Sequence, residues 1–326
     1  MGLAKQDIDA ARRMIAEARW VGVISHERPD GDAVGSLLGL SLALAQAGKQ
    51  VAPVLVDGLP ARYRFLPGSA EILRQFPSGV DLLITVDCSD FDRLGLPADR
   101  LPRLPDINLD HHPTNTQFAR VNLVDEQASA TAGLLVTLLP QLGLLLDSPV
   151  ASNLLVGIVT DTIGFRVPGV SSELLRQSAD LMDLGAPLAE IYDQTLNRHS
   201  LTAARYWGLG LARLQRDGRL LWATLTEEDR AQAGYPGNDD ADLINLLMTI
   251  DGADITLVFV EQPEGKVKVS WRARAGLDVS RIAAGFGGGG HELAAGAMSS
   301  GATPEVVERV LQATRPALGG REKGIG

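Results

Sequence analysis

Acidic residues and histidines recur through the first half of the chain, each group close to the end of an apolar run. The groups are His26, Asp30 and Asp32, then Asp87, then Asp110, His111 and His112, and finally Asp161. Carboxylate oxygens and imidazole nitrogens in this number are typical ligands of divalent cations. Two cations held close together activate a water and neutralise a phosphate. The sequence therefore predicts an enzyme that hydrolyses phosphate esters.

The spacing of these residues suggests how two cations would be held. An extended backbone would point the carboxylates of Asp30 and Asp32 the same way, with Gly31 permitting a bend close to a ligand. Asp87 stands alone after an apolar run and is the candidate bridge between the two ions. Mixed nitrogen and oxygen ligation in a near-octahedral shell favours manganese over magnesium, and zinc still less. We expect two Mn²⁺ per chain, with Mg²⁺ or Co²⁺ as substitutes.

The apolar runs before these residues predict a parallel sheet. The runs are residues 20–24, 51–56, 81–86 and 106–109, and helical spacing follows over 33–47 and 150–160. Runs that are apolar on successive residues are typical of strands covered on both faces. In such sheets the sites lie beyond the carboxyl ends of the strands. We therefore expect an α/β fold whose N-terminal part is a doubly wound, mainly parallel sheet.

The second half predicts a smaller α/β domain. Its expected elements are a strand at 219–226, a helix at 240–250, a hairpin of 253–260 with 266–274, and a last helix from Pro304. The expected division is a metal-binding domain at 1–184, a helical linker at 185–216, a substrate-binding domain at 217–318 and a disordered tail at 319–326. A cleft between the two domains would hold the substrate.

Composition narrows the class of protein. The chain has 326 residues, a formal net charge of −10 and a hydrophobic content of 45%. The acidic balance argues against a grip on long nucleic acid, which needs a basic surface, and favours small or short substrates. No apolar run approaches the roughly 20 residues that cross a bilayer, and the start lacks a secretory signal. The single cysteine, Cys88, excludes an intrachain disulfide, so we expect a cytoplasmic protein without membrane contact.

Anion-binding signals stand in the second half. Four glycines at 287–290 leave backbone N–H groups open to a phosphate, and His291 adds a donor. Residues 266–281 carry five cationic side chains against one acidic residue, Asp278. Arg272 is the candidate phosphate fork, because a guanidinium binds two oxygens at once.

Together these motifs carry a resemblance to a known family. HERPDGDAVGS at 26–36, Asp87, the Asp110–His112 triplet and Asp161-Thr162 resemble the DHH phosphoesterase superfamily. Ser270-Trp271-Arg272 and GGGGHELAAGA at 287–297 resemble its DHHA1 domain. A short chain with only these two domains is similar to the NrnA-type members. The resemblance implies degradation of short RNA or DNA oligonucleotides and pApA to mononucleotides, and conversion of 3′-phosphoadenosine 5′-phosphate (pAp) to AMP.

The resemblance also implies roles for individual residues. One manganese would be bound by His26, Asp30 and Asp87, and the other by Asp32, Asp87, His111 and Asp161. Catalysis would depend on Asp87, on His112 facing the scissile phosphate, and on Asp110 behind it. Substrate would be bound by Ser270, Arg272, Gly288, Gly289, Gly290 and His291. The family pattern Ser-x-Arg-Ser ends here in Ala273, so one polar contact is missing.

Other functions have sequence features that separate them from this one. A RecJ-like single-strand exonuclease shares both domains but typically carries a further nucleic-acid-binding module. A related pyrophosphatase has a second domain without GGGGH, and a membrane-attached cyclic-dinucleotide phosphodiesterase needs spanning segments. A nucleotide-sensing binding protein without turnover would lack some metal ligands, and all are present. The leucine-rich helices near the linker would either pack against a second copy, giving a homodimer, or complete the core.

Overall fold

The structure, a computed structural model, describes residues 3–167 and 169–318. It divides into two compact units, Met1–Arg198 and His199–Gly326. The division falls inside the segment expected to be a helical linker, which forms α6 (Leu188–Tyr192), a π-helix (Asp193–Asn197) and α7 (Leu201–Leu211). The domain bounds expected from the sequence stay a prediction, and the expected tail at 319–326 lies outside the described residues.

The first unit contains a five-stranded parallel sheet in the order β2-β1-β3-β4-β5. The strands are β1 (Trp20–Ile24), β2 (Gln50–Val54), β3 (Leu82–Val86), β4 (Ile107–Asp110) and β5 (Val121–Val124). All five residues of β3 are buried, as its unbroken apolar run predicts for a central strand. The prediction of a parallel sheet is confirmed, while β5 had no counterpart among the expected strands.

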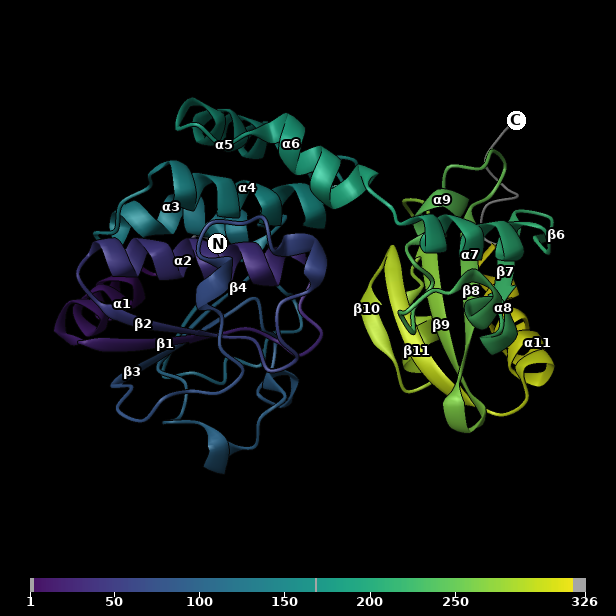
Figure 1. Cartoon of the computed structure of the whole chain (residues 1–326), viewed down its shortest axis with the longest axis horizontal. Helices are drawn as coiled ribbons and strands as arrows, with labels where there is room; N and C mark the ends of the chain where they lie inside the picture. The colour runs from purple at the N-terminus through teal and green to yellow at the C-terminus, as the bar shows by residue number, and fades with distance from the viewer. Residues whose placement is uncertain (1–2, 168, 319–326) are drawn as a thin grey trace. The chain divides into compact units, whose positions relative to one another are not determined.

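Helices cover one face of this sheet. They are α1 (Lys5–Glu17), α2 (Gly31–Gln46), α3 (Thr131–Gln141), α4 (Ser148–Asp161) and α5 (Ser172–Asp183). Figure 1 shows α2, α3 and α4 on the same side of the sheet, with α5 packed beyond α4. On the other face Ile24 and Leu83 pack against Phe76, Phe91 and Leu94, which lie on long connections with only short 3₁₀ turns. Loops thus replace helices there.

Two glycines let α2 and α4 approach each other closely. A Cβ atom on Gly31 would lie 2.2 Å from Thr160 Oγ1, and one on Gly35 would lie 2.5 Å from the Asn153 carbonyl oxygen. Real Cβ atoms do not come this near to other atoms, so neither position accepts a side chain without movement of a helix. The contacts run in opposite directions along the two helices, which brings the start of α2 to the end of α4.

The second unit contains a six-stranded sheet in the order β10-β11-β9-β8-β7-β6, in which only β7 and β8 are parallel. Its strands are β6 (Gln215–Asp217), β7 (Leu220–Leu225), β8 (Ile255–Gln262), β9 (Lys266–Ala273), β10 (Gly289–His291) and β11 (Ala294–Ser300). Its further helices are α8 (Glu227–Ala233), α9 (Leu243–Leu247), α10 (Ser280–Ala284) and α11 (Thr303–Thr314). The β8–β9 hairpin and the α/β class are therefore confirmed.

This second sheet is covered on both faces. Trp271 and Leu257 pack with Val310 of α11 on one side, while Val258 and Val260 pack with residues of α7 and α9 on the other. Within the described part of the chain, none of the helices combines the length and the apolar character needed to cross a membrane.

Candidate metal centre

The acidic residues and histidines of the first unit meet at the carboxyl edge of its sheet. His26 follows β1 by two residues, Asp87 follows β3 directly, and Asp110 ends β4. These three strands are neighbours in the sheet. Asp161 is the last residue of α4. The expected placement beyond the strand ends therefore describes the site well.

The local conformation expected for Asp30 and Asp32 is wrong. Asp30 is the N-cap of α2, and its Oδ1 accepts hydrogen bonds from the N–H groups of Asp32 at 3.1 Å and Ala33 at 3.0 Å. The helix begins at Gly31, so the two carboxylates do not lie on an extended strand. The capping bonds satisfy N–H groups that a helix start leaves without partners. Gly31 is required by the contact with Thr160 rather than by a bend.

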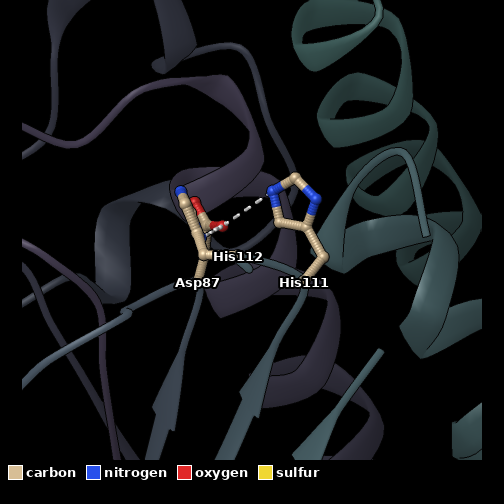
Figure 2. Close-up of side chains that lie close together, drawn as sticks. All are labelled: Asp87, His111 and His112. Carbon is tan, nitrogen blue, oxygen red and sulfur yellow. Dashed lines mark ion pairs between the residues drawn. The ribbon is translucent and has the colours of Figure 1, made fainter. Parts of the chain in front are cut away.

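The Asp87 carboxylate lies between histidines from two strands. Its Oδ2 is 3.5 Å from His26 Nε2, and its Oδ1 is 3.7 Å from His111 Nε2. Figure 2 shows the carboxylate facing the His111 ring. Two ligands that each lie about 2.1 Å from one cation are about 3 to 3.5 Å apart, depending on the angle between them. The Oδ2–His26 separation is at the upper end of this range, and the Oδ1–His111 separation lies slightly above it, so each oxygen of Asp87 has a histidine nitrogen near the spacing of a shared cation.

The remaining acidic residues divide between the two sides of Asp87. His26, Asp30 and Asp87 offer ligand atoms that all lie within 4.8 Å of one another, and so do Asp32, His111 and Asp161. His111 Nε2 is 3.5 Å from Asp161 Oδ2. A third such group joins Asp87 to His111 and His112. The first two sets share no residue, but His111 belongs to the second set and lies beside Asp87 of the first. Nitrogen and oxygen donors in two adjoining sets suit two divalent cations.

The electrostatics of the cluster show an excess of buried negative charge. Burial and the neighbouring Asp87 carboxylate raise the pKa of Asp32 to about 7. Burial and the charges of Asp32 and Asp30 raise the pKa of Asp161 well above its ordinary value. Burial lowers the pKa of His26, but the bond to Asp87 and the charges of Asp87 and Asp30 together outweigh burial and raise the pKa to about 9. Cations would relieve the repulsion that these shifts report.

The backbone at Asp87 is held in an uncommon conformation. Asp87 has a φ of 54°, in the left-handed region that few residues other than glycine adopt. The carbonyl oxygen of the next residue, Cys88, accepts hydrogen bonds from the side-chain amides of Asn108 at 3.3 Å and Asn115 at 3.2 Å. The Asp87 N–H donates to Leu109 O at 2.9 Å. These bonds hold the turn that aims Asp87 away from its strand.

His112 is oriented by a chain of hydrogen bonds. Its Nδ1 lies 2.7 Å from Asp110 Oδ1, and Asn115 Nδ2 donates to Asp110 Oδ2 at 2.6 Å. Asp110 is fully buried. Burial lowers the pKa of His112, but the Asp110 bond and the charges of Asp87 and Asp110 together outweigh burial and raise that pKa. Sequence reasoning missed Asn115, since it lies in a loop where its spacing carries no signal.

Sequence reasoning also missed Thr131, the first residue of α3. Its N–H donates to Asp32 Oδ2 at 2.6 Å, and the Ala132 N–H donates to Asp32 Oδ1 at 2.9 Å. The Thr131 hydroxyl donates to Asp87 Oδ1 at 3.0 Å. A threonine among small residues at a helix start is ordinary in sequence, so only the fold shows which carboxylates it meets.

In the second unit, the expected substrate-binding side chains lie on one face of the sheet. Residues two apart on a strand point the same way, so Ser270 and Arg272 share a face opposite to buried Trp271. Arg272 pairs across the sheet with Ala294, which pairs in turn with His291. Directly paired residues point to the same side. This register brings His291 and Arg272 to one rung of the sheet.

Arg272 is the best-defined polar group of this face. Its Nη1 donates to Trp271 O at 3.0 Å, while its Nε is buried without a partner among the described residues. Burial lowers the pKa of Arg272, and the carboxylates of Asp240 and Asp242 oppose that shift. Asp240 itself is buried, just before α9. A half-buried guanidinium with an N–H that has no partner among the described residues suits an anionic ligand.

The glycine run is only partly open. The Gly287 N–H donates to Ala284 O at 3.0 Å, and the Gly288 N–H donates to Ala283 O at 2.9 Å. The expectation that all four N–H groups are accessible therefore fails for these two, because they close the end of α10. Gly289 and Gly290 belong to β10, the exposed edge strand of the sheet, where backbone groups on the outer side have no strand partner among the described residues.

Comparison with known proteins agrees with both units. Residues 20–158 match the model of the DHH family, N-terminal domain, and residues 219–319 match the DHHA1 domain. A bifunctional oligoribonuclease and PAP phosphatase NrnA of Thermus thermophilus is 35% identical over 91% of this chain and 89% of its own length. The chain belongs to the DHH family. Its resemblance to NrnA-type proteins is confirmed, and membership makes it a hydrolase of phosphate esters.

Solved structures share the DHH fold. An exopolyphosphatase-related protein from Bacteroides fragilis is 26% identical with a TM-score of 0.90, over 97% of this chain and 98% of its own. RecJ from Thermus thermophilus in complex with Mn²⁺ is 16% identical with a TM-score of 0.56, over 98% of this chain and 55% of RecJ. At that identity the RecJ likeness shows the fold alone.

The two family matches contain most of the residues discussed above. His26, Asp87 and His111 lie within the DHH match, whereas Asp161 lies three residues beyond its end at 158. Arg272 and His291 lie within the DHHA1 match. The structure adds Asp161 to the DHH residues through its 3.5 Å approach to His111.

Proposed function

We propose that this DHH-family protein is a manganese-dependent phosphoesterase that degrades short oligonucleotides, pApA included, to mononucleotides and dephosphorylates pAp to AMP. The Thermus thermophilus relative carries oligoribonuclease and PAP phosphatase in its name, and it aligns along most of both chains. The net charge of −10 agrees with short substrates, since a long strand would meet an acidic protein.

One observation carries the proposal: the two oxygens of Asp87 face histidines of different strands. Oδ2 is 3.5 Å from His26 and Oδ1 is 3.7 Å from His111. We assign His26, Asp30 and Asp87 to one Mn²⁺, and Asp32, Asp87, His111 and Asp161 to the other. Mg²⁺ or Co²⁺ would substitute, because the donor set is mixed oxygen and nitrogen.

The residues beside the centre would act on the phosphate. Bound cations would lower the pKa of a water and neutralise phosphate charge. Asp110 accepts from His112 Nδ1, which leaves His112 Nε2 directed elsewhere. The buried Asp110 carboxylate at 2.7 Å from Nδ1 favours the imidazolium form, in which both nitrogens donate. His112 Nε2–H would therefore donate to a phosphoryl oxygen as charge develops there.

The DHHA1 unit would bind the nucleotide. Arg272 offers a guanidinium whose Nε has no partner among the described residues, and Ser270 lies two residues before it on the same face. His291 lies on the same rung as Arg272. We assign these side chains, with the exposed edge at Gly289 and Gly290, to a phosphate of the substrate. Gly288 contributes through the turn that it closes.

A single panel of substrates tests the function. Oligoribonucleotides and oligodeoxynucleotides from 2 to 24 residues, end-labelled, are incubated with Mn²⁺ beside pAp, pApA and pyrophosphate, and a chelator-treated sample is the control. We expect hydrolysis of the shortest oligonucleotides and of pAp, with little of the 24-mer and none of pyrophosphate. Hydrolysis of the 24-mer at the rate of the dimer would favour a RecJ-like exonuclease. Binding without turnover would indicate a nucleotide-sensing protein.

A further inference from the structure

The first residue of α3 contacts two different proposed ligands. Thr131 donates its N–H to Asp32 Oδ2 at 2.6 Å and its hydroxyl to Asp87 Oδ1 at 3.0 Å. Thr131 is fully buried, and so is the Asp32 carboxylate that it meets. The contacts cross 99 and 44 residues of sequence respectively. One residue thus joins α3 to carboxylates from α2 and from the end of β3.

We propose that Thr131 is a positioning residue of the cation centre, fixing through its hydroxyl how the Asp87 carboxylate is turned between the two ions. The inference rests on the proposed function, because it needs Asp87 to be the shared ligand. It adds a reason why Asp87 can be a ligand of both ions: the Thr131 hydroxyl, which is neutral and is not proposed to bind substrate, sets the orientation of the Asp87 carboxylate.

The Thr131 hydroxyl does not cap its own helix. Threonine near a helix start often caps the helix, but the N-cap of α3 is Ala130, and no side chain there accepts a capping hydrogen bond. The Thr131 hydroxyl is instead directed to Asp87. A buried hydroxyl that donates to a carboxylate of the cluster, and not to its own helix, indicates a role at the site.

The acceptor sites of the Asp87 carboxylate indicate how the Thr131 hydroxyl would orient it. A carboxylate oxygen has about two acceptor sites. On Asp87 Oδ1 one site accepts from Thr131, which leaves the other for the side of His111 and His112, whose nearest nitrogens each lie 3.7 Å away. Oδ2 remains for the side of His26. The torsion that turns a carboxylate is broad, so the left-handed backbone at Asp87 does not fix it alone.

Asp32 is restrained in a different way, by backbone. Its Oδ1 accepts from the Ala132 N–H at 2.9 Å and from the Ser36 hydroxyl at 3.2 Å, which uses both acceptor sites. Its Oδ2 accepts from the Thr131 N–H. One acceptor site therefore remains on Oδ2, and Asp32 would offer a cation a single oxygen. Side-chain changes at Thr131 leave these N–H donors in place, so they test Asp87 separately.

Three variants test the role of the hydroxyl. Thr131→Val removes the hydroxyl with little change of shape, and Thr131→Ser restores it. Thr137→Val is the control for loss of a threonine hydroxyl from the same helix, because this exposed residue donates only to Leu134 O among the described residues. Mn²⁺ is titrated calorimetrically into each metal-free protein, and electron paramagnetic resonance of the loaded protein reports magnetic coupling between the two ions. The thermal midpoint of each metal-free protein is measured as well.

We expect Thr131→Val to bind Mn²⁺ about 10- to 100-fold more weakly, the range found when partners behind metal ligands are removed. Its coupling signal should fall, while Thr131→Ser and Thr137→Val resemble wild type. Wild-type affinity and coupling in Thr131→Val would overturn the positioning role. If that variant does not fold, Thr131→Ala replaces it under the same criteria. A wild-type protein that fails to take up two Mn²⁺ would instead contradict the proposed function.

Discussion

The two units handle buried charge in opposite ways. In the first unit, carboxylates and histidines gather beyond the ends of parallel strands, where Asp32 and Asp87 are almost fully buried. In the second unit, Arg272 lies on the face of a mixed sheet, with Asp240 and Asp242 near enough to affect its pKa. The first arrangement has more carboxylates than histidines and suits cations. The second keeps a guanidinium whose Nε–H has no partner within residues 3–167 and 169–318, and it suits an anion.

This contrast also separates binding from chemistry. Ligand sets drawn from three strands and two helices depend on the whole fold of the first unit. The side chains proposed to bind nucleotide come from paired strands of one sheet, β9 and β10 with β11 between them. Changes in the first unit should therefore abolish turnover, and changes in the second should weaken substrate binding while cations stay bound.

The largest effect is expected at the shared ligand. Asp87→Ala should reduce hydrolysis of every substrate by more than about 100-fold, because partners behind a metal ligand already contribute 10- to 100-fold. Bound manganese, measured by mass spectrometry, should fall with it. Exposed Asp99 provides the control substitution to Ala. A variant that keeps a tenth of the activity and its manganese would disprove the bridging assignment.

The next effect is expected behind His112. Asp110→Asn should lower kcat about 10²- to 10⁴-fold, the range of general acid–base contributions, because His112 loses its carboxylate partner. The manganese content should stay at the wild-type value. Steady-state kinetics on pAp together with metal analysis check this. A rise in KM alone would show that Asp110 serves binding rather than orientation.

A smaller effect is expected in the second unit. Arg272→Lys should raise KM for pAp and dinucleotides about tenfold, equivalent to about 1.4 kcal/mol, because an ammonium cannot form the planar fork. Manganese affinity should not change. Arg274→Lys is the matched control on the same strand end, where Arg274 Nε donates to Ala253 O. Loss of manganese from Arg272→Lys would contradict the assignment of cation binding to the first unit and substrate binding to the second.

The smallest effect is expected at the acidic partner of Arg272. Asp240→Asn keeps the shape of the side chain. It removes one of the two carboxylates that counteract the effect of burial on the pKa of Arg272. We expect KM to rise a few-fold with kcat unchanged. Double-variant kinetics with Arg272→Lys should show less than additive losses. Fully additive losses would mean that Asp240 acts apart from Arg272.

The sequence predicted the parts of the site that depend on strand order. Apolar runs located β1, β3 and β4, and with them His26, Asp87 and Asp110, because the end of a parallel strand is a local signal. Long-range partners gave no such signal. Thr131 meets Asp32 across 99 residues, and Asp240 lies near enough to affect Arg272 because α9, which begins three residues later, packs against β9. The conformation of Asp30 was mispredicted because helix capping competes with an extended strand at such triplets.

The close contact of α2 with α4 limits which substitutions the first unit can accept between these two helices. The carboxylates of Asp32 and Asp161 come from the two helix ends that Gly31 and Thr160 bring together. Their separation thus depends on the main-chain distance between the two helix ends as well as on side-chain rotation. Even a methyl group at Gly31 or Gly35 would push the helices apart and enlarge the space between the ligands. Substitutions at Gly31 or Gly35 would then change the preference between smaller and larger ions, although neither residue is a proposed ligand.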